Sequence, residues 1–210
     1  MLASGAWPVD GTNPWEDAPI HLMQVLAPDL AVTGWADGCM WTWPGYTTPA
    51  PERPALLSYP RRGATIYPRQ RAAEWPFTPG EFVGLGGAVT GPHLYVFVPG
   101  TRRSRVTAAA LTGPGGPVEV RSVDNHTPDL GSYLPSGGIV IPAAPLQAGA
   151  TYRARVTVVA DGAPPLTRRW AFRTAGDAPA GPRRPRSAPR RGAATRVGTV
   201  SGRVRRALGF

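Results

Sequence analysis

The sequence predicts a mainly β fold, an immunoglobulin-like antiparallel sandwich that covers about residues 54–174. Glycine and proline, with 26 of each among 210 residues, favour short strands joined by turns and disfavour long helices. Within residues 54–174, short runs of β-forming residues alternate with turn residues at a spacing that suits a sandwich or barrel. Residues 152–158 alternate large and polar side chains with a period of two, which is typical of a half-buried strand.

The first 50 residues are rich in tryptophan, proline and glycine, and they predict one short helix followed by two short strands. Pro19 can begin the helix and Pro28 ends it, and the strands are expected at residues 30–35 and 39–43. A large apolar load for so short a stretch comes from four tryptophans, Trp15, Trp35, Trp41 and Trp43. We therefore expect residues 1–50 to pack against another part of the chain and not to fold alone.

Residues 47–54 read as a linker, and eight strands are predicted beyond it. Their expected ranges are 56–59, 71–75, 93–98, 106–111, 118–123, 138–141, 152–159 and 167–173. In the strand at 152–159, the face that carries Tyr152 and Val156 is expected to be buried. Because successive side chains point to opposite faces, Arg153 and Arg155 are expected to face water.

The spacing Leu146, Gly149, Tyr152 is similar to the tyrosine corner of sandwich domains. In that feature the phenol hydroxyl makes a hydrogen bond to the backbone of the preceding turn. Trp170 and Phe172 lie in the last predicted strand at alternate positions that share a face. We interpret these five residues as structural residues of the sandwich.

The formal net charge of +10 lies mainly in residues 176–210, which hold nine arginines against Asp177 for a net +8. These residues cannot bury enough apolar surface to offset the entropy cost of ordering, so we expect a disordered basic tail. The tail lacks interleaved aromatic residues and a nucleic-acid reading motif, so specific nucleic-acid binding is not expected. Weak, salt-dependent polyanion binding stays an open alternative to a merely solvated extension.

Cys39 is the only cysteine, which excludes an intramolecular disulfide and a zinc site built of cysteines. We expect its thiol to be a small buried apolar group. No stretch has the length and composition of a signal peptide or of a transmembrane helix. No transmembrane segment is therefore predicted.

The N-terminal part resembles the closing part of a CAP (SCP-like) domain. The resemblance rests on Asn13-Pro14-Trp15-Glu16-Asp17-Ala18-Pro19-Ile20-His21-Leu22, on Leu26-Ala27-Pro28 and on Ala31-Val32-Thr33-Gly34. In bacterial members a tryptophan, a proline or glycine and a histidine precede a short helix, and a strand containing glycine follows it. The resemblance covers about residues 7–48.

Downstream, the chain resembles the Ig-like module that follows CAP domains in some actinobacterial secreted proteins, at residues 73–80, 91–96, 146–152 and 170–174. The two resemblances divide the chain into three parts. Residues 1–50 are expected to be the C-terminal remnant of a CAP domain, residues 51–175 the Ig-like sandwich, and residues 176–210 the tail.

The resemblance implies a candidate metal position at His21. A complete CAP domain is a three-layer α-β-α unit whose cavity uses two histidines and two acidic residues, which bind a divalent metal in some members. His21 alone matches a cavity position, and we expect the remaining cavity residues to be encoded upstream of Met1. Because a single histidine is a poor metal site, no cofactor is expected, and a packed or hydrogen-bonded side chain is the competing interpretation of His21.

The expected function is a non-catalytic binding or spacer module, outside the cell or in the cell envelope, whose ligand the sequence does not identify. An envelope polymer or a protein is the expected kind of partner, and no enzyme activity is expected. The alternative is an inactive fragment of a CAP-type hydrolase or metal-binding protein.

Other candidate chemistries have simpler interpretations. His93 and His126 are expected in loops or at strand edges. Ser122, Asp124 and His126 are too close in sequence to converge as a catalytic triad. The glycines in the stretch 84–87 are expected to permit a turn, since no lysine follows them as in a phosphate-binding loop.

Overall fold

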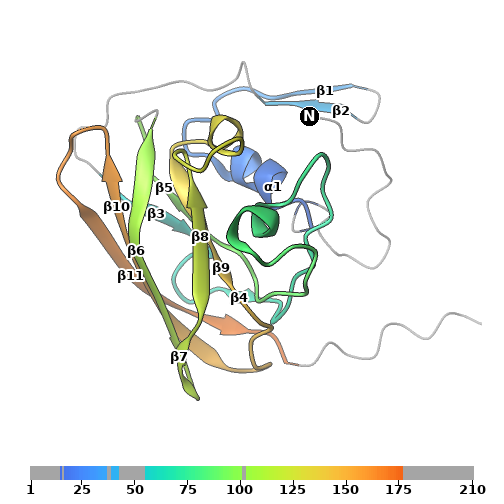
Figure 1. Cartoon of the computed structure of the whole chain (residues 1–210), viewed down its shortest axis with the longest axis vertical. Coiled ribbons are helices and arrows are strands. Elements are labelled where there is room, and N and C mark those ends of the chain that lie inside the picture. The colour runs from blue at the N-terminus through green and yellow to red at the C-terminus, as the bar shows by residue number, and fades with distance from the viewer. Residues whose placement is uncertain (1–14, 16, 37–38, 43–54, 101–102, 177–210) are drawn as a thin grey trace, which may run out of the picture. The chain divides into compact units, whose positions relative to one another are not determined.

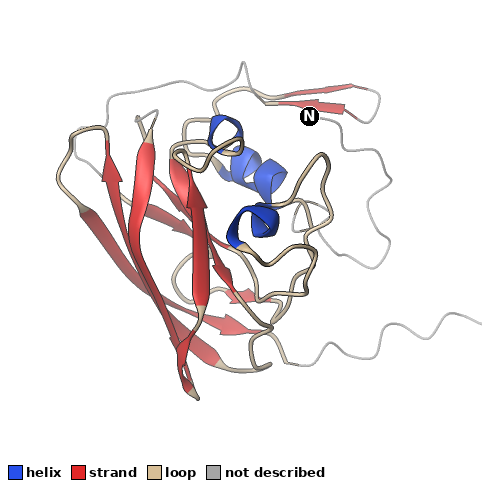
Figure 2. Cartoon of the chain, in the orientation of Figure 1, coloured by secondary structure: helices blue, strands red, loops and turns tan. Residues whose placement is uncertain are grey.

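The computed structural model describes residues 15, 17–36, 39–42, 55–100 and 103–176, with the backbone alone at 35, 36 and 39–41. Two sheets pack face to face around an apolar core, so the predicted mainly β sandwich is confirmed (Figures 1 and 2). The predicted linker, the predicted boundary between residues 50 and 51, and the predicted tail beyond residue 176 lie outside the described residues.

The larger sheet has five strands in the order β4-β11-β10-β6-β7. Their bounds are β4 Thr65–Ile66, β6 Ser104–Gly113, β7 Gly116–Val118, β10 Thr151–Ala160 and β11 Leu166–Thr174. Every pairing is antiparallel except that of β4 with β11, which run parallel. This pairing departs from the predicted antiparallel sandwich, because β4 and β11 lie far apart in sequence and no hairpin fixes their relative direction.

Strand β10 is central in this sheet and shows the burial that its sequence period predicts. Tyr152, Val156 and Val158 are buried between the sheets, whereas Arg153 and Arg155 are exposed. One face of the five-stranded sheet therefore belongs to the core and the other is open to solvent.

The smaller sheet has four antiparallel strands in the order β3-β5-β9-β8. Their bounds are β3 Leu57–Tyr59, β5 Leu94–Phe97, β8 Val120–Asp124 and β9 Gly137–Pro142. All four residues of β5 and all six of β9 are buried. This sheet is thus covered on both of its faces.

Two apolar clusters account for that burial. Leu94, Val96 and Val140 face the five-stranded sheet and join the core of the sandwich. Tyr95 and the other outward-facing residues of this sheet belong to a second cluster. Its buried members are Trp15, Ile20, Leu22, Met23, Ala27, Tyr95, Phe97, Val123, Leu130, Leu134, Ile139 and Ile141.

The N-terminal segment supplies the cover over this second face. Helix α1, Pro19–Leu26, has the bounds that Pro19 and Pro28 predict, and its Met23 is fully buried against the sheet. The 3-10 helices η2 (Pro79–Val83) and η3 (Gly131–Tyr133) lie on the same side, as Figure 2 shows for the helical elements. Strands β1 (Gly34–Ala36) and β2 (Cys39–Trp41) form a short antiparallel hairpin.

Two of the eight strands predicted beyond the linker are wrong, and of the strand predicted at 30–35 only residues 34 and 35 belong to a strand, β1. Residues 71–75 form a loop, because Ala73 N–H donates to Asp17 O (2.6 Å) and Glu74 binds helix α1, so the segment contacts the N-terminal part instead of a sheet. The predicted strand at 118–123 is two strands in different sheets. Strand β7 pairs with β6 and β8 pairs with β9, and the chain passes from one sheet to the other at Glu119.

Candidate functional site

His21 pairs with Glu74 at the start of helix α1. Its Nδ1 lies 2.8 Å from Glu74 Oε2, and the Glu74 side chain is 1% exposed. The same carboxylate accepts hydrogen bonds from Ile20 N–H (2.9 Å) and, more weakly, from His21 N–H (3.4 Å). A carboxylate at this position satisfies helix N–H groups that have no partner within the helix and complements the positive end of the helix dipole.

No local pattern predicts this pair, because the two partners lie 53 positions apart in the sequence. The Trp15 ring lies 6.3 Å from the His21 ring between centroids, so the imidazole is packed as well as hydrogen-bonded. Within the described residues, no three His, Cys, Asp or Glu side chains form a group that could hold a metal ion. The metal position at His21 stays a prediction.

The tyrosine corner is present as a hydrogen bond. Tyr152 Oη accepts from the Gln147 N–H at 2.7 Å, which is the contact that the Leu146, Gly149, Tyr152 spacing predicts. Gly149 has a φ of 68°, a value that glycine adopts without strain, and its N–H donates to Ala175 O. Leu146 is buried and its N–H donates to Pro68 O.

Phe172 and Trp170 both lie in the core between the sheets. Phe172 is fully buried and stacks on Tyr152, with ring centroids 5.8 Å apart. Trp170 is 4% exposed and pairs with Ala154 on β10. Its indole Nε1 has no hydrogen-bond partner among the described residues.

Ser122, Asp124 and His126 do not form a triad in the described structure. The Asp124 carboxylate accepts from Val106 N–H and from His126 N–H, each at 2.8 Å, so it binds the backbone of strand β6 and of a turn. The His126 ring instead lies 3.4 Å from the Arg103 guanidinium at an exposed position. Ser122 pairs with Val140 in the β8–β9 ladder.

The remaining candidates lie in turns and strands. Gly84 ends η2 with a φ of 75° and Gly86 has a φ of 49°, so these glycines serve a turn, as predicted. Cys39 begins β2, and the environment of its thiol stays a prediction. No helix in the described part of the chain is long and apolar enough to cross a membrane.

His93 is the most deeply buried of the three histidines. It is 3% exposed, and burial lowers its pKa from 6.5 to about 3. Its Nε2 lies 3.4 Å from Thr90 Oγ1, and the Thr90 hydroxyl itself donates to Gly91 O at 2.9 Å. The His93 Nδ1 atom is buried and has no hydrogen-bond partner among the described residues. His93 lies directly before strand β5, which confirms the predicted loop or strand-edge position, but nothing in the sequence indicated its burial.

A cavity of about 180 Å³ lies beside His93, where helix α1 meets the sandwich. It is lined by Asp17, Leu22, Tyr59, Ile66, Tyr67, Arg69, Gln70, Pro92, His93 and Tyr95. Helix α1 contributes Leu22, strands β3 and β5 contribute tyrosines, and β4 with the loop after it supplies most of the rest. The cavity therefore combines aromatic walls with a few polar groups, as ligand pockets commonly do.

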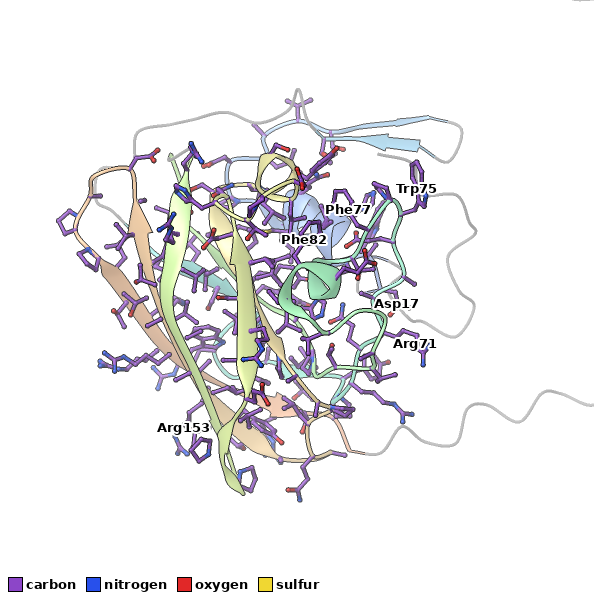
Figure 3. The ribbon with its side chains drawn as sticks, in the orientation of Figure 1. Asp17, Arg71, Trp75, Phe77, Phe82 and Arg153 are labelled. Atoms are coloured by element: carbon purple, nitrogen blue, oxygen red, sulfur yellow. The ribbon has the colours of Figure 1, made fainter. Side chains whose placement is uncertain are left out.

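The polar groups of this cavity have specific partners. Gln70 Oε1 accepts the His93 backbone N–H at 2.9 Å, and Gln70 also forms a two-way backbone bridge with Thr90. Partial burial raises the pKa of Asp17, which lines the same cavity. Figure 3 labels Asp17 and Arg71 on this side of the molecule.

No model of a known protein family and no curated protein matches the chain. Among solved structures, the chain is similar to the crystal structure of PcoC, a methionine-rich copper resistance protein from Escherichia coli, with 18% sequence identity and a TM-score of 0.37. The similarity covers 58% of this chain and 97% of the PcoC chain. These comparisons identify no family for the chain.

Proposed function

We propose that this chain is a non-catalytic binding module, outside the cell or in the cell envelope, of a protein related to the CAP family. In this proposal the cavity beside His93 binds a single small unit of an envelope polymer, such as one sugar residue. The observation that carries the proposal is that the N-terminal segment and the sandwich build this cavity together.

The size and lining of the cavity support a small, partly polar ligand. A volume of about 180 Å³ is below the range of about 300–1,000 Å³ that pockets for drug-sized ligands occupy, so an extended chain would not enter. Tyr59 and Tyr67 offer aromatic surface, while Arg69 and Asp17 offer charged groups that can bind hydroxyls.

The state of the histidines supports binding over catalysis. An efficient general acid or base has a pKa near the working pH, and burial holds the pKa of His93 at about 3. His21 is hydrogen-bonded to Glu74 at the start of helix α1, and His126 lies at an exposed position beside Arg103. The three histidines thus contact different elements and do not assemble one reaction centre.

Amide NMR of the full-length chain titrated with N-acetylglucosamine tests the proposal. We expect concentration-dependent shifts of the amides of Gln70, His93 and Tyr67. The variant Tyr67→Ala removes one wall at a side chain that is 47% exposed, so the fold should tolerate it and binding should weaken about tenfold.

Tyr133→Ala is the matched control, because Tyr133 is 45% exposed and does not line the cavity. This variant should bind like the unchanged chain. Shifts that avoid the cavity residues, or equal losses in both variants, would overturn the proposed site. Release of a cleaved product from an envelope glycan would contradict the proposal that the module is non-catalytic.

A further inference from the structure

Arginines gather on the open face of the five-stranded sheet, on the side of the sandwich away from the cavity. Arg153 and Arg155 project from β10, and Arg169 of β11 is the direct cross-strand partner of Arg155. Arg62 joins them from the turn before β4, where Gly63 N–H donates to Ala171 O at 2.8 Å. In Figure 3, Arg153 lies on the opposite side of the view from Asp17 and Arg71.

These four side chains line one groove, which we call the arginine groove. Its volume is about 470 Å³, and its lining is completed by Ala110, Thr112, Ala154, Trp170 and Ala171. Because Ala110, Thr112 and Ala171 are short, the arginine side chains stand above a low floor formed by β6 and β11. Trp170 is buried, so the floor offers no exposed aromatic ring.

The positive charge of the groove is not neutralised within the described part of the chain. The ion pairs found there are His21–Glu74 and Arg121–Glu119, and neither involves the groove. Arg168, the neighbour of Arg169 in sequence, differs because its guanidinium donates to Ser58 Oγ and Leu56 O at the other sheet. Like charges directly across an antiparallel pair are destabilising, so Arg155 opposite Arg169 costs stability unless an anion lies between them.

We propose that the arginine groove binds a linear anionic polysaccharide, with sulfate or carboxylate groups seated between guanidinium groups. A guanidinium group is planar and carries several N–H donors side by side. Two of them can donate parallel hydrogen bonds to two oxygens of one carboxylate or sulfate group. Adjacent strands are about 4.8 Å apart, and alternate residues of one strand about 6.8 Å apart, so the groove presents closely spaced cations along a line.

The floor of the groove favours a polysaccharide over single-stranded nucleic acid. Proteins that bind single strands stack bases on exposed aromatic side chains, and none lines the groove. Thr112 instead offers a hydroxyl that suits the hydroxyl groups of a sugar chain. No residue lines both the groove and the cavity beside His93, so this proposal goes beyond the proposed function and can fail or succeed independently of it.

The test compares two triple variants of the full-length chain in binding to heparin, measured by calorimetry at several salt concentrations. The groove variant is Arg153→Gln, Arg155→Gln and Arg169→Gln. The matched control is Arg190→Gln, Arg191→Gln and Arg196→Gln, which removes the same charge from the C-terminal tail. We expect the groove variant to bind heparin at least about tenfold more weakly in 0.15 M salt. The slope of the logarithm of its binding constant against the logarithm of the salt concentration should fall by the equivalent of about two to three charge contacts.

The control variant should bind heparin within about threefold of the unchanged chain, and neutral dextran should not bind. Equal losses in both triple variants would show a general charge effect and overturn the proposal. Tighter binding of DNA than of heparin at equal salt, lost in the groove variant, would assign the groove to nucleic acid and also overturn it. Thermal unfolding of each variant separates loss of binding from loss of fold.

Discussion

The outward faces of the two sheets differ in what covers them. The four-stranded sheet carries Tyr95, Phe97, Ile139 and Ile141 outward, and helix α1 with the neighbouring 3-10 helices buries them. The five-stranded sheet carries arginine, threonine and alanine outward, and that face is open. The same sandwich therefore has one face that belongs to a third layer and one that meets solvent.

This difference shows that the N-terminal segment is part of the fold and not an attachment to it. Without helix α1, the outward residues of β5 and β9 would expose a continuous apolar surface of the kind that binds or aggregates. With the helix in place, that surface becomes core, and the cavity beside His93 forms along its edge. The open face needs no cover because its outward side chains are charged or small.

Truncation of a core side chain on the covered face should give the largest effect. Ile139 is fully buried in the cluster shared with helix α1, so Ile139→Ala should lower the free energy of unfolding by about 2–5 kcal/mol. On the open face, Thr112→Ala should change it by no more than about 0.5 kcal/mol. Urea denaturation of both variants measures the difference, and equal effects would contradict the comparison.

Protonation of His93 should weaken the fold as the pH falls. The pKa of His93 is lowered to about 3 in the folded chain and returns to 6.5 on unfolding, so between these values the unfolded chain binds more protons. The contribution of neutral His93 to the free energy of unfolding is nearly complete at pH 7.5, and about 1.4 kcal/mol of it should be lost between pH 7.5 and 5.5. Burial raises the carboxyl pKa values of Asp17 and Asp29, so at lower pH the folded chain binds more protons at these groups and its stability rises as the pH falls. The prediction for His93 is therefore limited to pH 5.5 and above.

The variants His93→Gln and His126→Gln separate the buried histidine from an exposed one. The first should flatten the dependence of unfolding free energy on pH in this window, because no titrating group remains at the buried position. The second should leave the dependence unchanged. A slope that survives in His93→Gln would place the titrating group elsewhere.

Loss of the Glu74 charge should loosen the start of helix α1. Glu74→Gln keeps one acceptor but removes the charge that Ile20 N–H and the His21 ring contact, and we expect a loss of about 1 kcal/mol. Amide hydrogen exchange at Ile20 and His21 should rise. Glu119→Gln is the control, since its ion pair with Arg121 is exposed and should contribute less than about 0.5 kcal/mol.

Local patterns in the sequence predicted the open face well. The period of two in β10 placed Arg153 and Arg155 in solvent, and the spacing up to Tyr152 predicted a hydrogen bond that is present. Both depend on residues close in sequence. That Arg169 lies opposite Arg155 depends on the register of β10 with β11, which the sequence pattern does not specify.

The covered face could not be predicted in the same way. Burial of β5 and β9 on both sides depends on helix α1, which lies about seventy residues before β5, and nothing in either strand specifies which element covers it. Residues 71–75 form a loop and not the predicted strand because Glu74 binds a helix that is distant in sequence. The cavity combines residues from both regions and was missed for the same reason.

Relief of like-charge repulsion on the open face should give the smallest change in the free energy of unfolding, and this change should be an increase. Arg169→Thr replaces an arginine directly across from Arg155 with a residue that favours strands, so it should raise the free energy of unfolding by about 0.5 kcal/mol. The gain should shrink at high salt, because screening already weakens the repulsion in the unchanged chain. Arg71→Thr, at an exposed loop position on the other side of the molecule, should show no such gain. A salt-independent loss of stability in Arg169→Thr would contradict this prediction. It would mean that the Arg169 side chain packs against its neighbours and stabilises the fold.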